Sequence, residues 1–238
     1  MALAVVPVKE RAKRTSYLNR DVFATEFPRV LVIAPSSSFS GKTAMIGSLL
    51  RNPAFGMRRE YMNGANVFLH SSTADLADPQ LDGCGILPEN VRDRYDPEDV
   101  EELFAEQKEH IKNLGARAKP ICLILDDVVT EVTTAKDDPL TRAFTKGRHH
   151  NCSVWLLSQG YMFVPRGIRL NASDIILFRC NPTEIDRLAK EQSGVSPERF
   201  KQIYDHAIKE PYSFLHISCA SPLSRRYRVR FDGPIIDP

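Results

Sequence analysis

The stretch RVLVIAPSSSFSGKTAMIGSLLRN, residues 29–52, decides the fold of this chain. Residues 29–34 form a short apolar run rich in β-branched side chains, and the run stops at Pro35, which is the pattern of a buried β-strand. After a serine-rich segment, residues 43–52 carry apolar side chains at the spacing of an α-helix. The stretch therefore predicts a strand, a loop and a helix in that order.

The loop ends in Gly41, Lys42 and Thr43, which match the end of the phosphate-binding pattern G-x-x-x-x-G-K-S/T. In such a loop, successive backbone N–H groups point into one concavity at a helix N-terminus, where the helix dipole attracts an anion. Lys42 would reach the β- and γ-phosphates of ATP, and the Thr43 hydroxyl would bind Mg²⁺. The residues expected to surround the nucleotide are Ser36, Ser37, Ser38, Phe39, Ser40, Gly41, Lys42, Thr43 and Ala44.

This loop departs from the pattern at its first position, where Ser36 stands in place of the usual glycine. Variants of the pattern carry alanine there, so a Cβ is accommodated, and serine adds only a hydroxyl. We expect the loop to bind nucleotide because the strand before it and the helix after it are the context that the motif requires. The alternative is a serine-rich linker that happens to contain Gly-Lys-Thr.

A second apolar run, ICLILDD at residues 121–127, ends in two aspartates. Its continuous apolar character is typical of a strand that is buried on both faces of a parallel sheet. Asp126 would hold Mg²⁺ through water, and Asp127 would be the catalytic carboxylate that orients and polarises the attacking water. An aspartate pair can also cap a loop or a helix. Together with the loop around Lys42, the pair predicts hydrolysis of a nucleoside triphosphate.

Three further polar residues are candidates for the same reaction. Gln159 ends the apolar run CSVWLLSQ, and its amide could contact the γ-phosphate or the attacking water. The positive charge that completes a phosphoryl-transfer site is often an arginine from a neighbouring subunit. Arg148 is the first candidate for this finger and Arg169 the second. A polar strand end and two solvated arginines are the plain structural alternative.

The remaining pattern predicts an α/β fold. The runs at 29–34, 120–127, 152–159 and 172–180 are apolar strands separated by helical segments, which favours a mostly parallel, doubly wound sheet with right-handed crossovers and flanking helices. One helix is predicted over 97–114. The start of this helix is indicated by Asp96, which can cap it, and by Pro97 in its first turn, and its end is indicated by Gly115.

The composition is that of a globular protein, with 238 residues, 42% hydrophobic and 26% charged. No apolar run reaches the length that spans a bilayer, and apolar residues precede basic ones at the start, the reverse of a secretory signal. We therefore expect neither membrane insertion nor secretion.

The net charge of +2 hides two basic clusters near the ends of the chain. Their members are Lys9, Arg11, Lys13, Arg14 and Arg20 at one end, and Arg225, Arg226, Arg228 and Arg230 at the other. We expect a basic N-terminal arm over 1–28, an ATPase domain over 29–219 and a C-terminal strand and tail over 220–238. In the segment RRYRVRF, alternation predicts a strand with one basic face.

The order of the motifs is more specific than any one of them. The strand before Gly-Lys-Thr, the aspartate pair, FTKGRHHNCSVWLLSQ and VPRGIRLNASDIILFR together resemble the viral genome-packaging ATPases of the FtsK/HerA superfamily. This type occurs in nucleocytoplasmic large DNA viruses and their virophage relatives, and the likeness covers about residues 29–195. The matching positions are Gly147, Arg148, His149, Gln159, Arg169 and Asn171.

The resemblance implies a RecA-like ATPase that assembles into a homo-oligomeric ring, a pentamer or hexamer, and uses ATP and Mg²⁺. It further implies double-stranded DNA as the translocated partner, capsid or portal vertex proteins as docking partners, and a place in the cytoplasm of the host cell, at the viral factory, and in the virion. Two alternatives stay open. One is a P-loop nucleoside or small-molecule kinase, and the other is a non-catalytic nucleotide-binding scaffold, for which Ser36 is the best support.

Overall fold

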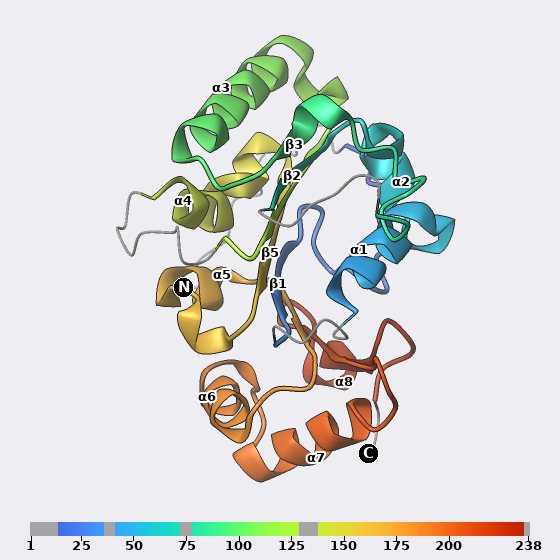
Figure 1. Ribbon diagram of the computed structural model, residues 1–238, viewed down its shortest axis with the longest axis vertical. Coiled ribbons are helices and arrows are strands. Elements are labelled where there is room, and N and C mark those ends of the chain that lie inside the picture. Colours follow the sequence, from blue (N-terminus) through green and yellow to red (C-terminus); the bar gives the residue numbers. More distant parts are fainter. Residues whose placement is uncertain (1–13, 36–40, 72–77, 129–137, 236–238) are drawn as a thin grey trace, which may run out of the picture.

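The computed structural model of the chain describes residues 14–35, 41–71, 78–128 and 138–235. Eight helices and eight strands form its framework, and Figure 1 shows the sheet between two layers of helices. The strands are β1 Arg29–Ile33, β2 Val67–Ser71, β3 Val91–Arg92, β4 Ile121–Asp126, β5 Cys152–Ser158, β6 Asp174–Leu177, β7 Leu215–Ser218 and β8 Tyr227–Val229. The helices are α1 Lys42–Arg51, α2 Met57–Glu60, α3 Pro97–Leu114, α4 Pro139–Lys146, α5 Arg166–Asn171, α6 Pro182–Gln192, α7 Pro197–Ala207 and α8 Leu223–Arg226.

The strands form one sheet in the order β3-β2-β4-β5-β1-β6-β7-β8. The six strands from β3 to β6 are parallel, while β7 is antiparallel to both β6 and β8. β5 lies between β1 and β4, so the strand that Gln159 follows separates the phosphate-binding strand from the aspartate strand. The predicted mostly parallel α/β sheet is confirmed.

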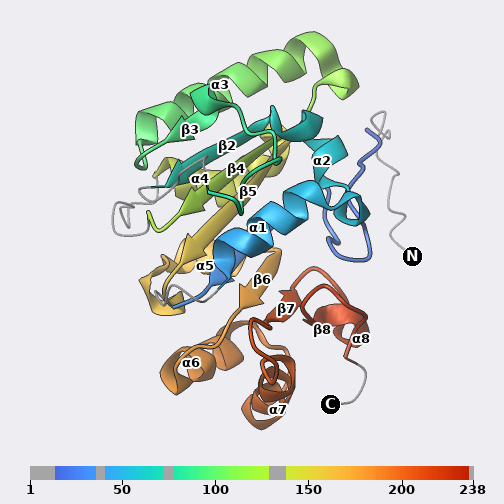
Figure 2. The ribbon, with the colours of Figure 1, turned by 45° about the vertical axis from the view of Figure 1, so that its right-hand side comes forward.

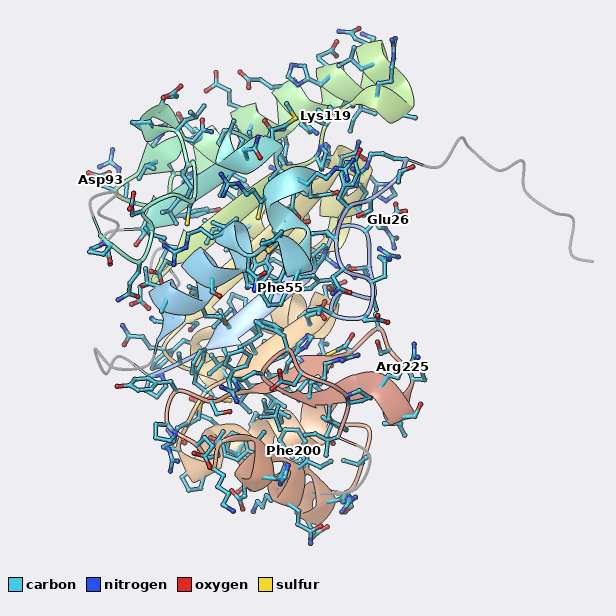
Figure 3. The ribbon with its side chains drawn as sticks, turned by 90° about the vertical axis from the view of Figure 1, so that its right-hand side faces the viewer. Glu26, Phe55, Asp93, Lys119, Phe200 and Arg225 are labelled. Atoms are coloured by element: carbon cyan, nitrogen blue, oxygen red, sulfur yellow. The ribbon has the colours of Figure 1, made fainter. Side chains whose placement is uncertain are left out.

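The two faces of the sheet carry separate apolar cores because side chains alternate along each strand. On β1, Val30 and Val32 pack toward α1 and α2, while Leu31 and Ile33 pack toward the layer of α3 to α7. Figure 2 shows α1 crossing one face of the sheet. Figure 3 looks onto that face, with Phe55 near its centre.

Several helix starts follow the signals in the sequence. Asp96 accepts a hydrogen bond from the N–H of Glu98 and so caps α3, and Gly115 ends that helix. Asn181 and Ser196 cap α6 and α7 in the same way, and each of these helices has proline in its first turn. Such caps satisfy N–H groups that have no partner within the helix. None of the helices in the described ranges is long and apolar enough to cross a membrane.

The described part of the expected N-terminal arm packs against the domain. Leu18, Val22 and Phe23 are buried in the core beneath α1, and Arg14 forms an ion pair with the buried Glu60. Residues 1–13, with three of the basic side chains, lie outside the described ranges.

The prediction for the C-terminal segment RRYRVRF is wrong in its extent. β8 has three residues, Arg226 belongs to the helical turn α8, and Arg230 has a φ of 52° that ends the strand. Arg228 is buried and donates a hydrogen bond to the carbonyl of Asp232. The three arginines therefore do not line one exposed basic face.

Candidate active site

The site lies at the carboxyl edge of the parallel strands, where β1 leads into α1. Gly41 is the N-cap of α1 and has a φ of 79°, in the left-handed region that a side chain disfavours. Lys42, Thr43 and Ala44 form the first turn of α1. Residues 36–40 lie outside the described ranges, so their contact with the nucleotide stays a prediction.

The ammonium of Lys42 faces both predicted carboxylates. Its Nζ lies 3.8 Å from Asp126 Oδ1 and 3.4 Å from Asp127 Oδ2. The Lys42 side chain is 11% exposed, and the two aspartates are 16% and 25% exposed. The fold thus brings together three charged groups from segments more than eighty residues apart, in a partly buried place where water screens them weakly.

Asp126 is the less exposed of the two aspartates. Burial raises the pKa of its carboxyl, whereas the charge of Lys42 and a hydrogen bond from Ser71 on β2 lower it. Its Oδ1 is buried and accepts no hydrogen bond from any residue that the structure describes. An oxygen of this kind suits a hard cation, and with the Thr43 hydroxyl it could hold Mg²⁺. The residues present therefore fit the predicted metal.

Asp127 follows β4, and its carboxylate lies beside Gln159, which follows β5. Its φ of 57° lies in the left-handed region, which aspartate tolerates better than most side chains. Its N–H donates to the carbonyl of Leu157 on β5, and Gln159 Nε2 donates to its Oδ2 over 3.2 Å. Lys42 and Gln159 thus hold the same carboxylate oxygen from two sides.

Arg148 lies far from this group in the same chain. It belongs to the short helix Gly147–His150 that precedes β5, so it is at the amino edge of the sheet, whereas Gln159 follows β5 at the carboxyl edge. At about 3.3 Å per residue, the seven residues of β5 separate the two edges by roughly 20 Å. Arg148 is exposed, and its role as a finger toward a neighbouring subunit stays a prediction.

Arg169 has a different environment, in α5. Its side chain is only 6% exposed, pairs with Glu191 at 3.5 Å and stacks over the ring of Tyr161. These contacts connect α5 to α6 and favour a structural role for Arg169 over that of a finger. The catalytic role predicted for it is supported by none of the contacts in the described residues.

The sequence reasoning missed two residues at the same edge. Ser71 ends β2 opposite Asp126 and hydrogen-bonds its carboxyl, and the serine pair that closes the run NVFLHSS could have indicated a polar strand end. Arg179 follows β6 and donates to the carbonyl of Ile208 over 2.9 Å. No pattern around Arg179 indicated that it lies at this edge, because its place depends on the strand order.

The sequence matches one protein family, described as Poxvirus A32 protein, over residues 15–204. The chain belongs to this family. The match includes the phosphate-binding segment, both aspartates, Gln159 and both candidate arginines. The resemblance to viral packaging ATPases, drawn above from the motifs, is thereby confirmed. A search of the curated proteins found no significant match.

Solved structures of low sequence identity share the fold of this A32 family member. The genome-packaging NTPase B204 of Sulfolobus turreted icosahedral virus 2, in complex with AMP, has a TM-score of 0.59 at 16% identity, over 85% of this chain and 96% of its own. B204 of Sulfolobus turreted icosahedral virus gives 0.57 at 16% identity over the same shares of both chains. EccC of Thermomonospora curvata, ATPases 2 and 3, gives 0.51 at 13% identity, over 89% of this chain and 37% of its own. The fold is therefore that of the P-loop NTPases.

Proposed function

We propose that this A32 family protein hydrolyses ATP and uses the free energy to move double-stranded DNA into a preformed viral capsid. The observation that carries the proposal is Lys42, which faces Asp126 and Asp127 within 4 Å at the carboxyl edge of a P-loop sheet. The B204 proteins, which share the fold, are named as genome-packaging NTPases, and one was solved with AMPPCP. These names support the same activity here.

Each residue of the site has a part that its position suits. Lys42 would leave the aspartates and neutralise the β- and γ-phosphates of bound ATP, because phosphate oxygens compete for its ammonium. Bound Mg²⁺, held by Thr43 and Asp126, would supply positive charge to the transferred group. Asp127 would accept a hydrogen bond from the attacking water, and Gln159 would orient that carboxylate.

The site of one chain would be completed by a second copy. Among the described residues, no arginine forms an ion pair with either aspartate, while Arg148 is exposed at the opposite edge. In a head-to-tail ring, the amino edge of one subunit could meet the carboxyl edge of the next. Arg148 would then stabilise the charge of the transferred phosphoryl group from outside.

A motor of this kind would grip DNA through its phosphates, because it must pass every base pair regardless of sequence. Its DNA binding should therefore weaken steeply with salt. Docking to capsid or portal vertex proteins and a place at the viral factory or in the virion belong to the same proposal.

The test is the rate of ATP hydrolysis with and without double-stranded DNA. We expect DNA to stimulate turnover, and Lys42→Ala to reduce it by about 1,000-fold or more because the phosphates lose their cation. Lys112→Ala is the matched control, since Lys112 is 72% exposed on α3. Turnover that ignores DNA but requires a small acceptor would indicate a kinase. No turnover by the folded protein would indicate a scaffold.

A further inference from the structure

One aromatic side chain beside the phosphate-binding segment is largely exposed. Tyr212 is 66% exposed, the most exposed of the seven tyrosines. Five others are buried and donate their hydroxyls to protein acceptors, and Tyr17 stacks under the guanidinium of Arg59. Tyr212 has neither a hydrogen bond through its hydroxyl nor a ring contact with any residue that the structure describes. Its exposure therefore needs another explanation.

The topology places Tyr212 at the nucleotide edge. β7 is antiparallel to β6, so the loop that precedes β7 lies where β6 and its neighbour β1 end. A side-chain carbon added at Gly41 would lie 3.9 Å from ring carbon Cδ1 of Tyr212. The ring is therefore next to the N-cap of α1, and the strand β7 that follows it lies on the opposite side of β1 from β4, where the aspartates are.

The loop presents Tyr212 in a defined conformation. Arg179 donates to the carbonyl of Ile208 before the tyrosine, and the N–H of Arg230 donates to the carbonyl of Phe214 after it. The N–H of Ser213 closes a turn onto the carbonyl of Glu210. Tyr212 itself has a φ of 58°, a left-handed conformation that is rare for a bulky residue and that occurs at many ligand-binding sites.

We propose that the ring of Tyr212 stacks on the base of the bound nucleotide. An exposed aromatic ring fixed beside a phosphate-binding turn offers a base the π-face that it needs, and such stacking depends little on which base is present. The phosphates would be held by the residues around Lys42 and the base by Tyr212, on either side of Gly41. This inference rests on the proposed nucleotide binding and adds the residue that recognises the base.

The test separates the base from the phosphates by titrating two ligands, ADP and inorganic tripolyphosphate, into the full chain by calorimetry. We expect Tyr212→Ala to weaken ADP binding about tenfold, as the loss of one stacked base does, and to leave tripolyphosphate binding unchanged. Tyr212→Phe should bind ADP as the wild type does, because the ring is kept. Tyr17→Ala is the matched control and should change neither affinity.

A second measurement uses fluorescence. The chain has one tryptophan, Trp155, which is fully buried in β5 and gives a constant background. In Tyr212→Trp, ADP should quench the new indole and tripolyphosphate should not. Equal loss of both ligands in Tyr212→Ala, or unchanged ADP binding, would overturn the inference while leaving the proposed function intact. A wild-type protein that bound neither ligand would refute both.

Discussion

The two edges of the parallel sheet carry opposite chemistry. At the carboxyl edge, one lysine lies between two carboxylates, and its attraction for each opposes their mutual repulsion. At the amino edge, Arg29 begins β1 near Arg148, and burial together with the charge of Arg148 lowers the pKa of the Arg29 guanidinium. Among the described residues of the site, the carboxyl edge has two carboxylates for one lysine, whereas at the amino edge two arginines lie near each other. The difference suggests that the amino edge offers a charge to a partner molecule.

The largest expected effect concerns the carboxyl edge. Asp127→Asn should reduce ATP turnover by about 100-fold or more, because the amide cannot polarise the attacking water. Asparagine tolerates the left-handed backbone at position 127 as aspartate does, so the substitution changes charge without straining the turn. Steady-state hydrolysis and ADP binding measure the two properties. Lost binding alongside lost turnover would show that Asp127 is part of the binding site instead.

The next test links the two edges. Arg148→Ala subunits and Asp127→Ala subunits should each be inactive alone, and mixing them should restore part of the activity, because some interfaces then pair an intact arginine with an intact aspartate. Arg117→Ala, another exposed arginine, should behave as the wild type in the same mixtures. If no mixing ratio restored activity, Arg148 would not act at the active site of a neighbouring subunit.

A smaller effect distinguishes the two candidate fingers. Arg169→Ala should destabilise the protein by about 1–3 kcal/mol, because it removes the buried cation over Tyr161 and leaves Glu191 with only Arg187 and the Tyr161 hydroxyl as partners. Arg187→Ala removes a 45% exposed partner of the same Glu191 and should cost less than about 1 kcal/mol. Urea unfolding measures both. If Arg169→Ala left stability unchanged but abolished turnover, Arg169 would be a catalytic residue.

The smallest effect is a pH dependence of Asp126. Burial raises the pKa of its carboxyl, and only the ionised form can hold Mg²⁺. The contribution of Mg²⁺ to nucleotide binding should therefore be complete above the raised pKa and be lost as pH falls through it, at a higher pH than for a free aspartate near 3.9. In Asp126→Asn, the contribution of Mg²⁺ to nucleotide affinity should show no such loss at low pH, as measured by titrations with and without Mg²⁺. A loss at low pH that persists in this variant would come from another titrating group.

Local signals in the sequence predicted much of the fold. The apolar runs gave β1, β4, β5 and β6, and Asp96 marked the start of α3 because its side chain caps the helix in the way that such residues usually do. The short helices α4 and α5 were missed, because six to eight residues show too little periodicity.

The candidate site was predicted in part. Lys42 and the aspartates could be found because each carries a motif, and the structure places them together. Arg169 has the sequence context of a functional residue, yet its burial against Glu191 depends on how α5 packs on α6. Tyr212 has no motif, and it lies beside Gly41 only because an antiparallel strand follows it. Contacts of this kind come from strand order, which local patterns do not contain.

The position of β5 has one more consequence. All seven of its residues are buried, and the strand pairs with β4 over residues 152–157 and with β1 over residues 154–158. Gln159 at one end touches Asp127, and Arg148 precedes the other end. If Arg148 reaches an adjoining subunit, β5 would form a rigid connection between the nucleotide site of its own chain and the nucleotide site of that subunit. A displacement at one site would then move the arginine at the other, and ATP hydrolysis in neighbouring subunits would be coupled mechanically.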